Sequence, residues 1–201
     1  MSQRFDTQAP TWDAESRRVR LAEAVTAAIL EAVPVEPNWR ALDFGCGTGL
    51  VTLALAPQVA GITGADASEG MLRELARKVE DQGLAQVEVL QVAATGPLAL
   101  NGPFDLITSS MTLHHVEHPV TRLDELRRHL RPGGWLALAD LAAEDGRFHD
   151  DLTGVFHLGF APETLQAHLH AAGYREIQVR LATTVLKGDR TYDVLLATGR
   201  A

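Results

Sequence analysis

The sequence has a single cysteine, no long apolar run and no excess of basic residues. One cysteine, Cys46, cannot form an internal disulfide, which agrees with a reducing cytoplasmic location. The longest apolar stretches, such as residues 135–139, are far shorter than the roughly 20 residues that span a bilayer. The first residues also lack the basic and apolar segments of a secretory signal. We therefore expect a cytoplasmic protein without a membrane partner.

The charge balance argues against nucleic acid as a partner. The formal net charge is −8 at pH 7, whereas a broad phosphate-binding surface is positive. A short basic cluster at residues 17–20 follows helical spacing and is interpreted as the solvated face of a helix. Because no repeat or linker divides the 201 residues, we predict a single domain over residues 1–201.

Apolar periodicity predicts strands that alternate with helices. Strands are expected at residues 40–44, 60–66, 87–93, 104–110 and 135–141, with helices at 49–56, 68–81, 120–130 and 162–173. A first helix runs from Asp13 to Ala32, with Thr11 or Asp13 placed to cap it. Residues 174–184 and 191–199 would form a closing hairpin. The pattern is typical of a doubly wound, mostly parallel α/β sheet with at least one antiparallel edge strand.

A glycine loop (residues 45–49) follows the first expected strand, with glycines at positions 45, 47 and 49. A tight turn needs only one glycine, whereas three allow the backbone to approach a ligand closely. In open parallel sheets, ligands bind beyond the carboxyl ends of the strands, so a cofactor is expected here. A dinucleotide fingerprint requires glycine or alanine where this chain has Leu50, and this disfavours a nicotinamide cofactor.

Asp66 ends the second expected strand, about 20 residues after the glycine loop, a spacing typical of a ribose-binding acid. Its carboxylate either accepts hydrogen bonds from ribose hydroxyls or caps the helix that starts near Ser68. The neighbouring glycine loop favours the ribose role.

These residues resemble the class I S-adenosylmethionine-dependent methyltransferase family. The likeness lies in residues 42–49 (LDFGCGTG), 64–72 (GADASEGML), 104–116 (FDLITSSMTLHHV) and 131–141 (RPGGWLALADL). It implies a seven-stranded Rossmann-like methyltransferase fold with a catalytic core at 38–201 and a cap helix region at 1–37. It also implies an enzyme that uses S-adenosyl-L-methionine to methylate a small-molecule acceptor.

The resemblance also implies the cofactor contacts. Asp43 would orient the ammonium group, and Asp66 would accept from the ribose. The remaining contacts implied for the methionine and adenine parts are Gly45, Cys46, Gly47, Gly49, Ala67, Met71, Ala93, Ala94 and Ser109. Many relatives have an acidic residue after the third strand, where this chain has two alanines. Cys46 is interpreted as a small buried filler and not as a nucleophile.

Two histidines at the end of the fourth expected strand are the candidate catalytic residues. The sulfonium cofactor is already an activated donor, so the protein has mainly to align the acceptor. His114 or His115 could act as a base if the acceptor binds protonated. The alternative is that one histidine packs or caps the next helix while the other is exposed.

The connection at residues 140–160 is long enough to act as a lid over the acceptor. Asp140, His149 and His157 within it are candidate substrate-site residues. Trp12 is a further candidate, with ordinary packing as the alternative. The spacing of these histidines and carboxylates fits no metal site, so no metal is expected.

Two other functions remain open at this point. A domain that binds the cofactor without catalysis could serve as a partner or regulatory subunit. A nicotinamide-dependent oxidoreductase would share the sheet and Asp66 but conflicts with Leu50. The sequence specifies neither the acceptor nor the oligomeric state.

Overall fold

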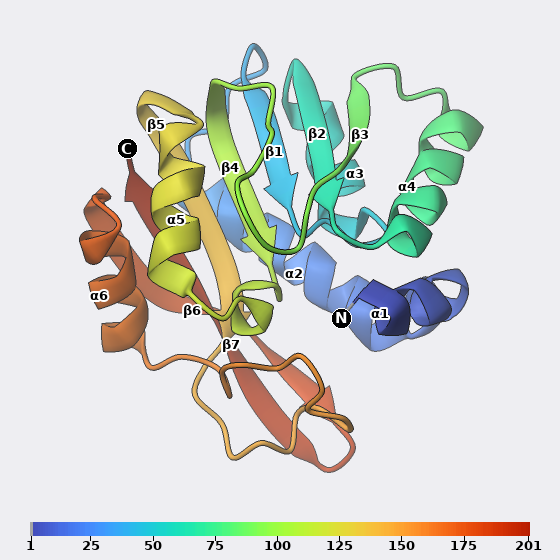
Figure 1. Cartoon of the computed structure of the whole chain (residues 1–201), viewed down its shortest axis with the longest axis vertical. Coiled ribbons are helices and arrows are strands. Elements are labelled where there is room, and N and C mark those ends of the chain that lie inside the picture. The colour runs from blue at the N-terminus through green and yellow to red at the C-terminus, as the bar shows by residue number, and fades with distance from the viewer. Residues whose placement is uncertain (1) are drawn as a thin grey trace.

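The computed structural model describes residues 2–201, and within them seven strands form one sheet in the order β3-β2-β1-β4-β5-β7-β6 (Figure 1). The strands are β1 (Arg40–Phe44), β2 (Gly61–Asp66), β3 (Val87–Gln91), β4 (Phe104–Ser110), β5 (Leu130–Leu141), β6 (Arg175–Lys187) and β7 (Arg190–Arg200). β1 to β5 are parallel, and β7 is antiparallel to both β5 and β6. The mostly parallel α/β sheet with an antiparallel C-terminal strand is thus confirmed.

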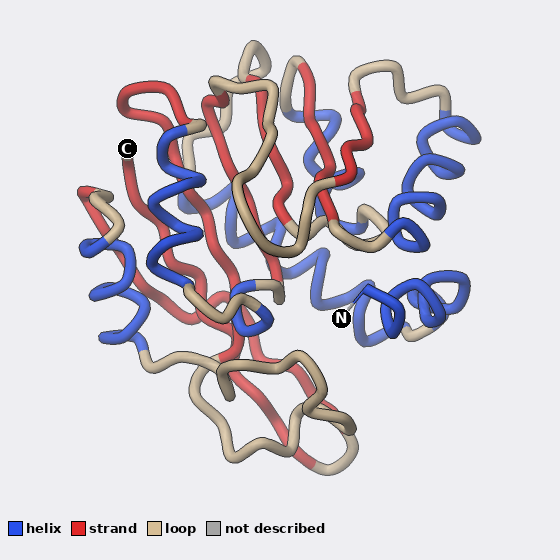
Figure 2. Tube along the Cα trace, in the orientation of Figure 1, coloured by secondary structure: helices blue, strands red, loops and turns tan. Residues whose placement is uncertain are grey.

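Helices cover both faces of the sheet (Figure 2). They are α1 (Ser2–Gln8), α2 (Ser16–Ala32), α3 (Leu50–Leu55), α4 (Glu69–Gln82), α5 (Pro119–Arg128) and α6 (Pro162–Ala171), with short 3-10 turns η1 (Ala9–Ala14), η2 (Ala56–Gln58) and η3 (Leu113–His115). Successive strand residues point to opposite faces. Leu106 therefore packs in the core under α2 and α3, while Ile107 packs in the core under α5 and α6.

A loop takes the place of a helix between β3 and β4. Residues 92–103 contain no helix, and the buried side chains of Val92 and Leu98 pack into the core on the α5 face. The backbone N–H of Leu98 donates to Glu125 of α5. Only the start of this loop, residues 92–94, lines the cavity described below.

Two details of the sheet differ from the sequence predictions. The antiparallel strand β7 lies between β5 and β6, so it is not an edge strand. The helix expected at residues 120–130 ends earlier and the strand expected at 135–141 starts earlier, because α5 stops at Arg128 and β5 begins at Leu130, with Pro132, Gly133 and Gly134 inside the strand. The backbone of this segment pairs with the end of the chain, and the N–H of Gly133 donates to the carbonyl oxygen of Ala201 at 3.1 Å.

The start of the chain also differs from prediction. Two elements, α1 and η1, precede α2, which begins at Ser16 and has no side-chain cap. Asp13 does not cap this helix because its carboxylate accepts from Thr48 Oγ1 at 2.6 Å and contacts Lys78. The N-terminal segment is thereby fixed to the loop after β1 and to α4. Among residues 2–201, no helix combines the length and the hydropathy that a membrane span requires.

Candidate functional site

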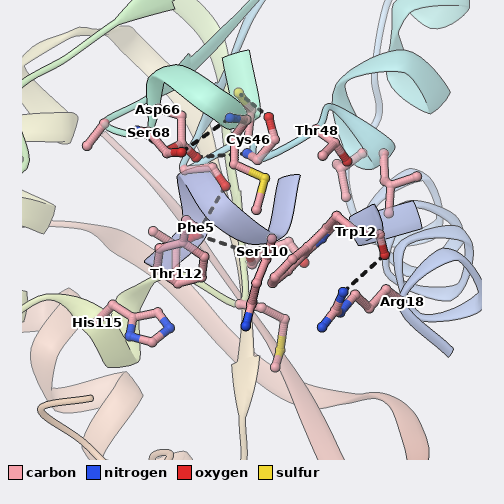
Figure 3. Close-up of a pocket in the computed structure, with 18 of the residues that line it drawn as sticks. Phe5, Trp12, Arg18, Cys46, Thr48, Asp66, Ser68, Ser110, Thr112 and His115 are labelled. Carbon is pink, nitrogen blue, oxygen red and sulfur yellow. Dashed lines mark hydrogen bonds between the residues drawn. The ribbon is translucent and has the colours of Figure 1, made fainter. Parts of the chain in front are cut away.

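A cavity of about 330 Å³ opens beyond the carboxyl ends of β1, β2 and β4 (Figure 3). One wall consists of the glycine loop and the start of α4. The opposite wall consists of residues 110–116 and 148–150, and the N-terminal elements α1 and η1 cover the side between them. The expected position of the ligand site at this sheet edge agrees with the position of this cavity.

Each glycine of the glycine loop meets a different steric demand. A Cβ at Gly45 would lie 2.3 Å from the side chain of Thr112, and one at Gly49 would lie 2.3 Å from Leu75 Cδ1. At Gly47, with φ +55°, only Met71 Sδ comes within 4.0 Å of that position. The backbone at Gly47 is thus open toward the cavity, where a side chain would stand between the main chain and a ligand.

Gly49→Ala is expected to destabilise the protein by about 2–3 kcal/mol, because positive φ strain adds to a clash with a fully buried leucine. Gly83→Ala is the matched control, since Gly83 has φ +64° but no atom within 4 Å of the new Cβ. We expect it to cost only about 1 kcal/mol. Urea denaturation measures both free energies of unfolding. Equal losses would show that packing against Leu75 is not the constraint.

Asp66 connects the two halves of the cofactor-side wall. Its Oδ2 accepts from the backbone N–H of Gly47 and its Oδ1 from that of Ser68, both at 2.8 Å. Burial raises the pKa of Asp66, and the two backbone hydrogen bonds oppose this shift. The helix-capping alternative for Asp66 is wrong, because the cap of α4 is Ser68, whose Oγ accepts from the Met71 N–H at 3.2 Å. Asp66 also lines the cavity, so its carboxylate still faces the space where a ligand would lie.

Asp43 lies beneath the glycine loop with 1% of its surface exposed. Its carboxylate accepts from Thr52 Oγ1 at 2.6 Å and from Thr108 Oγ1 at 3.0 Å. Burial raises its pKa to about 6, and the two hydroxyls limit that shift. Cys46 above it is also buried, and burial raises the pKa of its thiol well above the ordinary value. Cys46 is thus not an activated nucleophile.

His114 stands on the opposite wall with only 1% of its surface exposed. Its Nδ1 lies 2.6 Å from Asp140 Oδ1, and its backbone N–H donates to Asp140 Oδ2 at 3.2 Å. Burial opposes ionisation of Asp140, but His114 and the N–H of Leu141 lower its pKa. The carboxylate can only accept, so Nδ1 carries the proton. His114 Nε2 is left with a lone pair and has no hydrogen-bond partner among the described residues.

Two more imidazoles adjoin His114. The ring centroid of His115 lies 4.1 Å away and that of His149 4.9 Å away. Burial, followed by the proximity of His114, lowers the pKa of both rings to about 4, so both are neutral at pH 7. His115 Nδ1 donates to the carbonyl oxygen of Gly154 at 2.8 Å. No group of side chains in residues 2–201 has the arrangement of a metal site.

The N-terminal segment closes the cavity between the two walls. The ring of Phe5 makes edge contacts with Trp12 at 5.9 Å and with His115 at 5.4 Å between centroids (Figure 3). The Arg18 guanidinium lies 3.7 Å from the Trp12 ring centroid. Asp6 fixes this segment to α4 by accepting from Ser68 Oγ at 2.6 Å. Trp12 therefore packs within a cover over the site.

Most of the residues expected at the site line the cavity. They are Trp12, Asp43, Gly45, Cys46, Gly47, Asp66, Ala67, Met71, Ala93, Ala94, His114, His115 and His149. Their roles toward a ligand stay predictions. Gly49 and Asp140 lie behind this lining, and each contacts a residue that forms it, Cys46 and His114 respectively.

Two expected site residues point elsewhere. Ser109 is buried in the sheet, where its hydroxyl donates to the carbonyl oxygen of Phe44 at 2.9 Å, and the next residue, Ser110, lines the cavity instead. His157 packs on Phe160, with Nε2 3.0 Å from the carbonyl oxygen of Val116.

The interpretation of the basic cluster as a solvated face is wrong for two of its arginines, whereas Arg20 is exposed as expected. Arg17 and Arg18 line the cavity, and their side chains are 17% and 25% exposed. A signal for this was present, because cations in the first turn of a helix oppose its dipole and need another reason for their position.

Comparisons with known proteins agree with this architecture. Residues 41–134 match the model of a methyltransferase domain family. The chain is 39% identical over 137 residues to trans-aconitate 2-methyltransferase of Azoarcus sp. (strain BH72), covering 64% of this chain and 50% of that protein. It is 35% identical over 146 residues to the biotin biosynthesis bifunctional protein BioCD of Bordetella avium (strain 197N), covering 72% of this chain and 30% of that protein.

The chain thus spans half or less of the length of these two curated relatives. Among solved structures, a SAM-dependent methyltransferase from Aquifex aeolicus superposes with a TM-score of 0.71 at 23% identity. That match covers 96% of this chain and 97% of the other and shows a common fold.

Proposed function

We propose that this chain is a class I S-adenosylmethionine-dependent methyltransferase that transfers the methyl group of that cofactor to a small-molecule acceptor, and the match of residues 41–134 to a methyltransferase domain family supports this. The observation that carries the proposal is the pairing of two different walls around one cavity. The glycine loop with Asp66 forms one, and the buried His114 with its unpartnered Nε2 forms the other.

The residues on the cofactor-side wall fit S-adenosylmethionine. Gly47 exposes its backbone to the cavity, and Asp66 presents a carboxylate suited to ribose hydroxyls. Asp43 supplies negative charge near the methionine end. Neither Asp43 nor Asp66 forms an ion pair with another of the described residues. Backbone groups of Ala93 and Ala94 lie at the adenine end, where no acidic side chain is present.

The bound cofactor supplies a methyl group that is already activated by its sulfonium. The protein has to hold an acceptor in line with that group and to exclude water, and such positioning contributes roughly 7–11 kcal/mol. His114 is the proposed base for an acceptor that binds protonated. The loop after β5 carries His149 into the acceptor-side wall, and its Phe156 N–H donates to the His114 carbonyl oxygen at 3.0 Å. We assign this loop the role of acceptor-side cover.

S-adenosylhomocysteine is expected to raise the melting temperature, and this tests cofactor binding. At about 100 times its dissociation constant the ligand adds about 2.7 kcal/mol, which corresponds to roughly 5–10 °C for a chain of this size. NADH at the same concentration is the control and should leave the temperature unchanged. A shift with NADH but none with S-adenosylhomocysteine would reverse the assignment in favour of an oxidoreductase.

A further inference from the structure

Charge is divided between the two ends of the cavity. Of the three carboxylates that line the cavity, Asp43 and Asp66 lie on the cofactor side, and Asp150 lies on the acceptor side beside Lys187. Four cationic side chains line the acceptor side and its rim: Arg4, Arg17, Arg18 and Lys187. The whole chain has a net charge of −8, so its composition alone does not account for four cations at one end of the cavity.

The ion pairs of these cations leave an excess of positive charge. Arg17 and Arg18 share one carboxylate, that of Glu15. Arg4 pairs with Asp151, and Lys187 pairs with Asp150 at 2.7 Å. Four cations therefore face three carboxylates, and Asp150 is 87% exposed while Lys187 is 22% exposed. Since exposed carboxylates are strongly screened by water, the cations act on the cavity more than their partners do.

Two of these cations connect to His114 through one continuous wall. Arg17 Cζ and Lys187 Nζ lie 5.6 and 5.7 Å from the centroid of the Phe148 ring. That ring packs edge-on against His149 at 5.1 Å, and His149 lies 4.9 Å from His114. The cations Arg17 and Lys187 are therefore connected to the unpartnered Nε2 of His114 through the rings of Phe148 and His149.

The lone pair is a separate observation that points to a ligand. His114 is almost fully buried, lines the cavity and has no partner for Nε2 among the described residues. A buried polar atom without a partner is costly, so it is commonly satisfied by a ligand or by water. Asp140 fixes Nδ1 as the protonated nitrogen, so what Nε2 needs is a donor, such as a hydroxyl.

We propose that the acceptor is a small aromatic acid bearing a hydroxyl group, with its anionic end toward Arg17 and Lys187 and its hydroxyl at His114 Nε2. This inference rests on the proposed methyl transfer and specifies its substrate class. The ring lies along Phe148 and His149. The negative charge is held at the cationic end of the cavity, away from Asp43 and Asp66.

The proposed reaction balances without a further reactant. The hydroxyl proton moves to His114 Nε2, and the resulting imidazolium is stabilised by the Asp140 carboxylate. The hydroxyl oxygen forms a bond to the methyl carbon, and the electron pair of the broken methyl–sulfur bond stays on sulfur. The products are a methyl ether and a neutral thioether, and His114 returns its proton to solvent.

The test compares para-hydroxybenzoate with its neutral methyl ester and with benzoate, which lacks the hydroxyl. Binding is measured by saturation-transfer NMR with S-adenosylhomocysteine present, and turnover is measured with S-adenosylmethionine. We expect para-hydroxybenzoate to bind, to be methylated on the phenolic oxygen and to exceed its ester by at least about tenfold in kcat/KM. Benzoate should bind without reacting.

Arg17→Gln and Lys187→Gln should each weaken binding of para-hydroxybenzoate and leave that of the ester unchanged. Arg73→Gln is the matched control, because Arg73 is 68% exposed on α4 and is not among the residues that line the cavity. The two test residues lie on different elements, so a folding failure in one leaves the other decisive. Retained binding of S-adenosylhomocysteine certifies each variant as folded.

Several results would overturn the inference. The inference is wrong if the ester reacts as well as the acid, or if the methyl group is transferred to the carboxylate. If S-adenosylhomocysteine binds and none of the three probes does, the acceptor class is wrong and the proposed methyl transfer stands. If S-adenosylhomocysteine itself fails to bind, the proposed function fails first.

Discussion

Asp66→Ala is expected to weaken binding of S-adenosylhomocysteine by at least about a hundredfold. The carboxylate would accept from ribose hydroxyls, and hydrogen bonds to a charged group contribute about 1.5–3 kcal/mol each. The same carboxylate also holds the N–H groups of Gly47 and Ser68, so its loss loosens the backbone that faces the ligand. Isothermal titration calorimetry measures the change directly.

Asp81→Ala is the control for the loss of one negative charge. Asp81 lies on α4, is 60% exposed and pairs with Arg77 of the same helix. Its replacement should leave the affinity unchanged. Asp66→Asn separates the two functions of Asp66, since an amide oxygen still accepts one backbone hydrogen bond but carries no charge. If Asp66→Ala binds S-adenosylhomocysteine with full affinity, the ribose assignment is wrong.

His114→Asn is expected to lower kcat by about 10²–10⁴-fold while the affinity for S-adenosylhomocysteine stays within a factor of two, as is typical of a lost general base. This expectation holds for an acceptor whose hydroxyl must lose its proton. Asp140→Asn should lower kcat as well, because an amide can hydrogen-bond the wrong imidazole tautomer. Steady-state kinetics with para-hydroxybenzoate, followed over pH, measures both.

The pH profile distinguishes a base from a packing residue. If His114 is the base, His114→Asn should change the shape of the pH profile of kcat/KM, whereas loss of a packing residue should leave that shape unchanged. The ionisable groups that face this ring are Asp140, His115 and His149, with Arg4 and Glu144 beyond them. His115 is a weak alternative because burial lowers its pKa to about 4. A larger loss in His115→Asn than in His114→Asn would transfer the role, and His170→Asn on the exposed side of α6 serves as control.

The fold could be predicted from the sequence because local patterns determine most of its elements. Alternating apolar residues and the glycine loop place β1 at Arg40–Phe44 and β4 at Phe104–Ser110, with the predicted boundaries. The position of β7 inside the sheet depends on long-range pairing and has no local signature. The first residues of β5 were missed for a different reason, because Pro132 and the two glycines after it are residues that usually mark turns and loops.

The cofactor side was more predictable than the acceptor side. Glycines and an aspartate at fixed spacing indicate a ligand that the backbone approaches closely, and both line the cavity. The acceptor side is assembled from Arg17, His114, Phe148 and Lys187, which are far apart in the sequence. Only the tertiary fold brings such residues together. The choice of Ser109 over Ser110 failed because strand periodicity alone does not say which face of β4 meets the cavity.

The place of β7 has a consequence for how the chain matures on the ribosome. Residues 190–200 are made last among the described strands, yet they fill the gap between β5 and β6. Until they emerge, β5 keeps an open edge with unpaired backbone groups, and such edges invite pairing with other chains. Before residues 190–200 pair with both neighbouring strands, the β5 edge is therefore a place where the folding chain can associate with another chain.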